Sequence, residues 1–211
     1  MDIADIVLDE LIHEYYVDGE KTPYVTGILG AVGMYKDLDK IPSWILDMAA
    51  DRGKVVHECI ELHCKGILDE STIDPELQGY FDAYLACRAE NSSVYDALTD
   101  FEKTVYSKEY HYCGKYDAGG DGIIIDHKTT NKSSPVHGLQ LTAYWMSEHP
   151  DFIKDKPKLL ACGYYHKNGK YEFVKYEYQP LIWLSILTVY NWQRKNGIEL
   201  NTKSKKKRKD D

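Results

Sequence analysis

The chain has 211 residues, of which 43% are hydrophobic and 28% are charged, and its formal net charge is −8. This composition is that of an ordinary soluble globular protein, and no apolar run is long enough to span a membrane. The N-terminus opens with acidic residues and lacks the order of a secretory signal, basic first and then apolar. We therefore expect a cytoplasmic protein with no membrane partner.

The first half of the chain is predicted to be mainly helical. A short helix is expected at residues 3–16, and a loop at 22–24 leads into residues 25–32. Two longer helices follow at residues 43–65 and 75–91, the first with Ser43 as N-cap after Pro42 and with Gly66 as its stop. This helical N-terminal part would shape one side of any binding channel.

The helix at residues 43–65 has two distinct faces. Apolar residues at helical spacing predict a buried stripe made of Ile45, Met48, Val55, Cys59 and Leu62. Gly53, His57 and Glu61 lie on another face. A glycine within a helix costs about 1 kcal/mol relative to alanine, which suggests a close approach at that point. His57, one turn later, is a candidate metal or phosphate ligand, although a histidine in such a place is more often an ordinary surface residue.

The second half changes to strands. Strands are predicted at residues 98–106, 110–118 and 122–128, followed by a helix at 136–147. Two further strands, 158–167 and 170–178, flank the tight-turn signal Asn168-Gly169, and a last helix covers 181–195. Strands with helices before, between and after them predict an α/β fold: a mixed central sheet flanked by helices, in one domain covering residues 1–200.

The hairpin at residues 114–130 is the most informative segment. If its turn centres on Asp121-Gly122, Asp117 falls opposite Asp126. Because side chains alternate along a strand, Asp126 and Lys128 share a face, and His127 points the other way and is packed or hydrogen-bonded. Two carboxylates and an ammonium group on one face suit a divalent cation and a phosphodiester. A turn centred on residues 119–120 would instead move Asp117 away from Asp126 and weaken a shared metal site. The other interpretation of these three charged residues is a solvated cluster of ion pairs on a hairpin.

The helix after this hairpin places Gln140 and Tyr144 on one face, because they are four residues apart. An amide and a phenol on one exposed turn would hold a nucleic-acid backbone or a base. If the pair stood alone, ordinary hydrogen bonding at the boundary between helix and sheet would be the favoured interpretation.

Cysteines and the C-terminal tail suggest no further site. The five cysteines are scattered without a CxxC pair, which favours reduced thiols over disulfides, zinc or an iron–sulfur cluster. Residues 201–211 hold six of the 26 basic residues and are predicted to be a disordered tail. This tail would either attract phosphates without specificity or serve as a solubilising end.

Four short motifs occur in a fixed order, and with them the chain resembles the PD-(D/E)XK nuclease superfamily. The pairs are Gly53 with His57, Gly114 with Asp117, Asp126 with Lys128, and Gln140 with Tyr144. Within the superfamily the chain resembles the RecB-type exonuclease group, and residues 22–33 and 42–61 are similar to the phage-type and mitochondrial genome maintenance exonucleases. Tyr116 replaces the usual proline before the first aspartate, and the cluster cysteines of some members are missing.

The resemblance implies a restriction-endonuclease-like fold and a metal-dependent DNA nuclease. Asp117, Asp126 and Lys128 would be catalytic, and His57, Asp117 and Asp126 would bind Mg²⁺ or Mn²⁺. Gln140 and Tyr144 would position DNA. An exonuclease in replication, recombination or repair is expected, with DNA ends or single strands as substrate and a recombination or replication protein as partner. The alternatives are a structure-specific endonuclease of this fold and a noncatalytic DNA-binding protein. Glu102 would match an acidic position of relatives, although an exposed strand glutamate is the simpler interpretation.

Overall fold

The structure, a computed structural model, describes residues 5–9, 12–35, 41–130 and 132–198. Its centre is a five-stranded mixed sheet in the order β4-β5-β6-β7-β8. The strands β6 and β7 are parallel, and the other neighbouring pairs are antiparallel. The bounds of the strands are Asp100–Ser107 for β4, Tyr112–Gly120 for β5, Ile123–Lys128 for β6, Leu159–Tyr165 for β7 and Tyr171–Tyr176 for β8.

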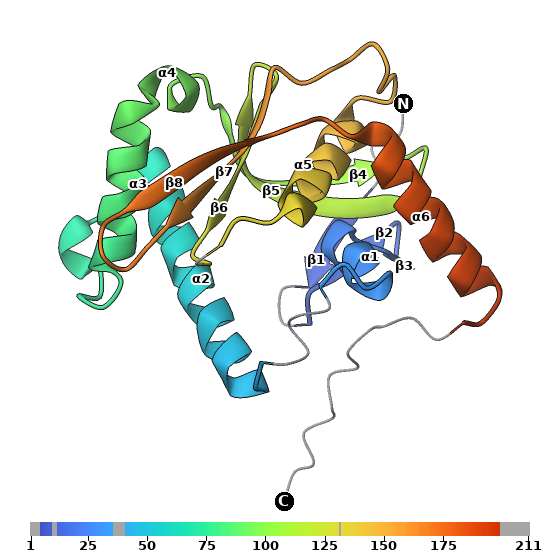
Figure 1. Cartoon of the computed structure of the whole chain (residues 1–211), viewed down its shortest axis with the longest axis horizontal. Coiled ribbons are helices and arrows are strands. Elements are labelled where there is room, and N and C mark those ends of the chain that lie inside the picture. Colours follow the sequence, from blue (N-terminus) through green and yellow to red (C-terminus); the bar gives the residue numbers. More distant parts are fainter. Residues whose placement is uncertain (1–4, 10–11, 36–40, 131, 199–211) are drawn as a thin grey trace, which may run out of the picture.

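Helices cover both faces of this sheet (Figure 1). On one face α1 (Val25–Ala31), α5 (Pro135–Glu148) and α6 (Pro180–Lys195) supply a core that contains Leu29, Leu141 and Trp183. On the other face α2 (Ser43–Cys64), α3 (Gln78–Glu90) and the short α4 (Ser92–Tyr95) enclose a second core. The predicted fold class, α/β with a mixed central sheet flanked by helices, is confirmed. None of the described helices is long and apolar enough to cross a membrane.

The N-terminal segment differs from its predicted helix. Its described part forms a small antiparallel sheet of β1 (Ile6–Asp9), β2 (Glu14–Val17) and β3 (Glu20–Thr22). Asp18 and Gly19 form the turn between β2 and β3, both with positive φ. An Asp-Gly pair followed by a short alternating segment is a hairpin signal, and it outweighs the weaker helical periodicity upstream. The prediction of a helix over residues 3–16 is therefore wrong for this part.

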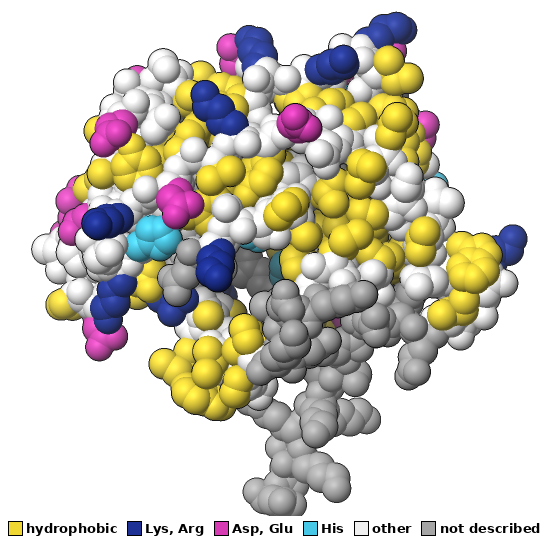
Figure 2. All heavy atoms as spheres, in the orientation of Figure 1, with side chains coloured by type: hydrophobic (Ala, Val, Ile, Leu, Met, Phe, Trp, Pro, Cys, Tyr) yellow, Lys and Arg dark blue, Asp and Glu magenta, His cyan; other side chains and the backbone are white. Residues whose placement is uncertain are grey.

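The long helix α2 begins at Ser43 as predicted but buries a different face. Val56 and Ile60 are its buried residues, while Ile45, Met48 and Val55 are 41%, 63% and 43% exposed. The first half of α2 extends beyond the sheet layer (Figure 1), and Figure 2 shows hydrophobic side chains gathered at that end. The predicted buried stripe is thus wrong for Ile45, Met48 and Val55, whereas Cys59 is partly buried against the second core. Pro42, and not Ser43, is the N-cap, without a side-chain hydrogen bond.

The remaining predicted elements match the structure to within a few residues. The short helix η2 (Glu70–Thr72) was not predicted and lies in the connection between two predicted helices. Gly169 adopts positive φ in the turn that joins β7 and β8, as the Asn-Gly signal predicts. The predicted basic tail, residues 201–211, lies outside the described residues.

Candidate active site

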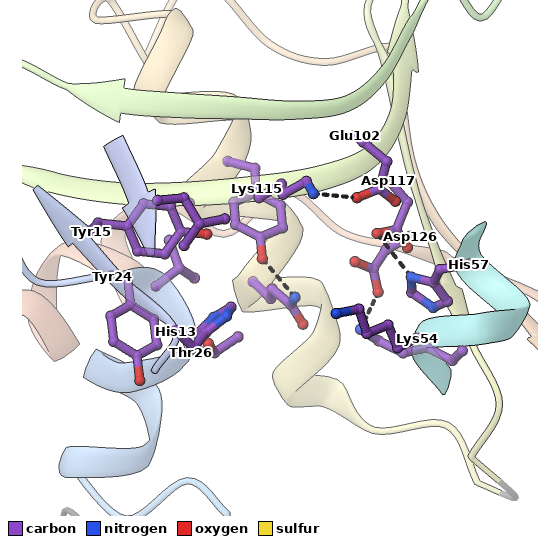
Figure 3. A pocket seen from close by; sticks show the side chains of 16 residues that line it. His13, Tyr15, Tyr24, Thr26, Lys54, His57, Glu102, Lys115, Asp117 and Asp126 are labelled. Atoms are coloured by element: carbon purple, nitrogen blue, oxygen red, sulfur yellow. Dashed lines mark hydrogen bonds and ion pairs between the residues drawn. The ribbon is translucent and has the colours of Figure 1, made fainter. Parts of the chain in front are cut away.

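One cavity of about 420 Å³ lies between the N-terminal sheet, α1, α2 and the middle of the central sheet. The six residues predicted to bind metal or DNA or to act in catalysis all line it, namely His57, Asp117, Asp126, Lys128, Gln140 and Tyr144. Figure 3 shows that the acidic groups and His57 are grouped on one side of the cavity, and that His13, Tyr24 and Thr26 stand on the other. Residues that are far apart in the sequence are therefore brought into one pocket.

The turn at Asp121-Gly122 fixes the two aspartates. Ala118 pairs with Ile125 and Gly120 with Ile123, which centres the turn as predicted and rules out a loop centred on residues 119–120. Beyond Ala118 the ladder opens, and the Asp117 carboxylate takes its place: Oδ2 accepts a hydrogen bond of 2.5 Å from the His127 backbone N–H. The other oxygen of Asp117 remains directed at the pocket, 3.3 Å from His57 Nδ1.

His57, Glu102 and Asp117 form the candidate metal centre. Each offers one ligand atom, and the three atoms lie within 4.8 Å of one another. Glu102 has φ of 51°, and it interrupts the β4–β5 ladder opposite Asp117. Its side chain is 20% exposed and pairs with Lys115 at 2.7 Å. The interpretation of Glu102 as an exposed strand glutamate is therefore wrong.

Asp126 stands beside this group rather than within it. Its side chain is 4% exposed, and its Oδ2 is in contact with the ammonium group of Lys128. Oδ2 also lacks a hydrogen bond of ordinary geometry to the described residues. The three-residue group that meets the metal-ligand distances contains Glu102, and Asp126 lies next to this group with its Oδ2 against Lys128.

Burial and the neighbouring charges shift the pKa values strongly. Burial opposes protonation of His57, but the charge and hydrogen bond of Asp117 outweigh it and raise the pKa of His57 to about 9. Burial also opposes ionisation of Asp117, yet the positive charge and hydrogen bond of His57 hold its pKa well below the usual range. Asp117 and His57 therefore form a partly buried ion pair when no cation is bound.

The other two carboxyl groups shift in the opposite direction. Burial and the negative charge of Asp117 raise the pKa of Asp126 to about 6. Burial and the same charge raise the pKa of Glu102. Burial opposes the charge of Lys128, but Asp126 outweighs it and raises the Lys128 pKa. The carboxyl groups of Glu102, Asp117 and Asp126 therefore repel one another, and a bound divalent cation would relieve this repulsion.

His127 faces away from the pocket, as strand alternation predicts. Its Nδ1 lies 2.9 Å from the Tyr165 hydroxyl, and its ring packs among Tyr84 and Tyr95 in the core on the α3 side. Burial lowers its pKa to about 4. Its contribution to the site is the backbone N–H that holds Asp117.

Gln140 and Tyr144 are buried, 6% and 3% exposed, and do not form the exposed turn expected from the sequence. Gln140 Nε2 donates to the Tyr144 hydroxyl at 2.7 Å. A Cβ at Gly114 would lie 2.5 Å from the Tyr144 ring, so the glycine makes room for this tyrosine. The second and fourth motifs are therefore in direct contact, and the pair forms the pocket floor.

Gly53 shows no tight approach within the chain. A Cβ at this position would meet Thr129 Oγ1 at 3.6 Å, which is an ordinary contact distance. The close approach predicted from this glycine is not found among the described residues.

Sequence reasoning missed several residues of the pocket. Lys54 lies one turn before His57 on α2 and is exposed, and Lys115 lies two residues before Asp117 on β5. His13 comes from a segment without a motif, and Tyr24 and Thr26 lie in the stretch 22–33, whose resemblance indicated no site residue. The i,i+3 spacing of Lys54 and His57 was the available signal for the first. No local signal marked the others, because their position depends on how two sheets pack.

The donor set fits a hard or borderline divalent cation. Two carboxylates and one imidazole offer oxygen and nitrogen ligands, without a thiolate that would favour softer metals. His57 would release its proton when the cation binds, since only the neutral imidazole is a ligand.

The comparisons with known proteins give no family. No protein-family model matches the chain, and no curated protein matches its sequence. Among solved structures the chain is similar to a putative exonuclease from Eubacterium rectale, with 11% identity and a TM-score of 0.47, over 70% of this chain and 68% of the other. This degree of likeness carries no argument for the site.

Proposed function

We propose that the protein is a metal-dependent deoxyribonuclease, with an exonuclease as its preferred form. The observation that carries the proposal is the meeting of His57, Glu102 and Asp117 with Asp126 and Lys128 in one cavity. Largely buried acids arranged around a common point, with a largely buried lysine beside them, form the electrostatic environment that hydrolysis of a phosphodiester requires.

His57, Glu102 and Asp117 would hold Mg²⁺ or Mn²⁺, with Asp126 as a further carboxylate next to them. A divalent ion held there would neutralise charge on the scissile phosphate and lower the pKa of water.

The protein's own residues would perform the remaining work. Lys128 keeps its charge in the pocket and would orient the attacking water and stabilise the negative charge that develops at phosphorus. The exposed Lys54 would hold a neighbouring phosphate. Gln140 and Tyr144 would position the strand from the pocket floor.

A structure-specific endonuclease with the same site is the second candidate, and a noncatalytic DNA-binding protein is the third. The resemblance of the four motifs to the RecB-type exonuclease group favours the exonuclease. The complete set of acidic groups and lysine disfavours a binding protein. A role in replication, recombination or repair, within phage biology and with a protein partner from such a pathway, is part of the same proposal.

The deciding experiment uses linear and closed-circular DNA, each with Mg²⁺, Mn²⁺ or EDTA. Metal-dependent loss of linear DNA alone would support an exonuclease, and nicking of circles an endonuclease. No metal-dependent change in either substrate would overturn nuclease activity and leave a binding protein.

Lys128→Ala is predicted to fold and to lose the divalent-dependent cleavage, because the buried positive charge at the phosphate is removed. The loss of one such group typically lowers the rate about 100-fold or more. Melting curves check folding. Lys158→Ala is the matched control, since Lys158 pairs with Asp121 at 2.7 Å at the exposed turn end of the same hairpin. Unchanged cleavage by Lys128→Ala would refute the assignment.

A further inference from the structure

The pocket has a second wall that the nuclease site does not use. It is formed by His13, which is exposed, by the half-buried Tyr24 and by the buried Tyr15 behind them. The ring centroids of His13 and Tyr24 are 5.0 Å apart at 80°, and those of His13 and Tyr15 are 5.7 Å apart at 88°. We call these three residues the aromatic wall. In Figure 3 the wall stands across the cavity from Asp126, His57 and Lys54.

The aromatic wall is attached to β5, the strand that carries Asp117. Tyr24 forms an isolated bridge with Cys113 of β5, and the Cys113 backbone N–H donates to the Pro23 carbonyl at 2.8 Å. Asp117 lies four residues further along the same strand. Backbone pairing therefore fixes the place of Tyr24 in the wall relative to Asp117.

Local features hold the rings in place. A Cβ at Gly27 would lie 2.8 Å from the Tyr24 ring, so the glycine allows this ring to rest on the first turn of α1. His13 has φ of 52°, in the connection between β1 and β2 that turns its side chain toward the cavity. Tyr15 is 2% exposed and supports the His13 ring from behind.

The two walls differ in the chemistry they can bind. One wall offers acidic metal ligands and the ammonium groups of Lys54 and Lys128, which suit a phosphate. The other wall offers ring surface, which suits a nucleobase. A nucleotide has both parts, separated by its sugar, and a cavity of about 420 Å³ is within the usual size for small-ligand sites.

We propose that the aromatic wall is a base-binding subsite, in which the ring of His13, supported by Tyr15 and Tyr24, stacks on an unpaired base next to the scissile phosphate. This inference rests on the proposed nuclease function and names its substrate class: single-stranded DNA or a frayed strand end. A base inside intact duplex has both faces covered by its neighbours, so it stacks on a side chain only after leaving the helix.

The test is binding of a short single-stranded oligonucleotide that carries a fluorescent adenine analogue near its end, measured with Ca²⁺ so that the DNA is not cleaved. His13→Ala is expected to bind the oligonucleotide roughly 5- to 100-fold more weakly and to lose the fluorescence quenching that stacking produces. His13→Phe keeps a flat ring without the imidazole and is expected to bind and quench as the wild type does. Blunt duplex affinity should be similar in all three proteins.

His111→Ala is the matched control. His111 is also exposed and has φ of 52°, but it lies in the β4–β5 turn beside Tyr106, outside the pocket. Wild-type affinity and quenching in His13→Ala would overturn the subsite, and so would equal losses in His13→Ala and His13→Phe. Absence of metal-dependent cleavage by the wild type overturns the nuclease proposal instead, and the binding comparison still decides the base subsite.

Discussion

Glu102 connects backbone geometry with chemistry in this pocket. A glutamate with positive φ inside a strand is uncommon, and such conformations cost on the order of 1–3 kcal/mol. The β4–β5 ladder opens at this residue, opposite the place where Asp117 turns to accept from the His127 N–H. The strained residue and the opened ladder together bring two carboxylates to one point. Lys115 balances the Glu102 charge at 2.7 Å in the absence of a cation.

Glu102→Gln is predicted to weaken Mn²⁺ binding roughly tenfold or more, because one anionic ligand of the group is removed while the size of the side chain is kept. Calorimetric titration of the folded protein with Mn²⁺ measures this directly. Glu109→Gln, an exposed substitution in the β4–β5 turn, is the control and should bind Mn²⁺ as the wild type does. Equal affinities in all three proteins would remove Glu102 from the metal site.

The glycines of two neighbouring helices show how differently one residue type acts within an element. Gly53 in the middle of α2 would tolerate a Cβ, whereas a Cβ at Gly79, in the first turn of α3, would lie 1.9 Å from the Lys167 carbonyl oxygen. The first glycine is therefore not required by packing within the chain. The second permits the β7–β8 turn to lie directly on α3.

We predict opposite stability changes from one substitution at these two positions. Gly53→Ala should raise the free energy of unfolding by up to about 1 kcal/mol, the gain in helix propensity. Gly79→Ala should lower it by roughly 1–3 kcal/mol, because the backbone of the β7–β8 turn must shift. Urea unfolding of both variants measures the two changes. A destabilised Gly53→Ala would show that a contact not seen in the described residues depends on this glycine.

Elements with a strong local signal could be predicted from the sequence, and so could the motif residues on them. Asp121-Gly122 fixes the β5–β6 register, and alternation then places Asp126 and Lys128 on one face and His127 on the other. Burial could not be predicted where it depends on partners. The exposure of Met48, the burial of Gln140 and the place of His13 are decided by which elements pack together, and periodicity within one segment does not contain that information.

At the scale of the whole molecule, charge is distributed unevenly in relation to the proposed substrate. The chain carries 34 acidic and 26 basic residues, so its average field repels DNA. The pocket nevertheless gathers Lys54, Lys115 and Lys128. Glu102, Asp117 and Asp126 line the same pocket and offset these charges, so without a cation the pocket repels DNA less than the acidic protein does as a whole. The layered fold provides this arrangement, because the N-terminal sheet and α2 approach the central sheet from two sides.

The partly buried His137 makes the free energy of unfolding depend on pH. His137 lies with its Nδ1 2.6 Å from the Tyr164 hydroxyl, and burial, helped by the charge of Lys128, lowers its pKa to about 4. Its pKa in the unfolded chain is about 6.5. Between these two values the unfolded state binds a proton that the folded state does not. The stability contributed by His137 is therefore present above pH ~6.5 and is lost as the pH falls toward about 4.

Comparison of the wild type with His137→Gln isolates this contribution, since the remaining groups titrate in both proteins. We expect acidification from neutral pH to pH ~4 to cost the wild type on the order of 1–3 kcal/mol more than the variant. Urea unfolding at several pH values, with EDTA present to keep the metal site empty, measures the difference. Parallel pH profiles of the two proteins would mean that the pKa of His137 is not lowered in the folded state. That result would contradict the burial of His137 against Tyr164.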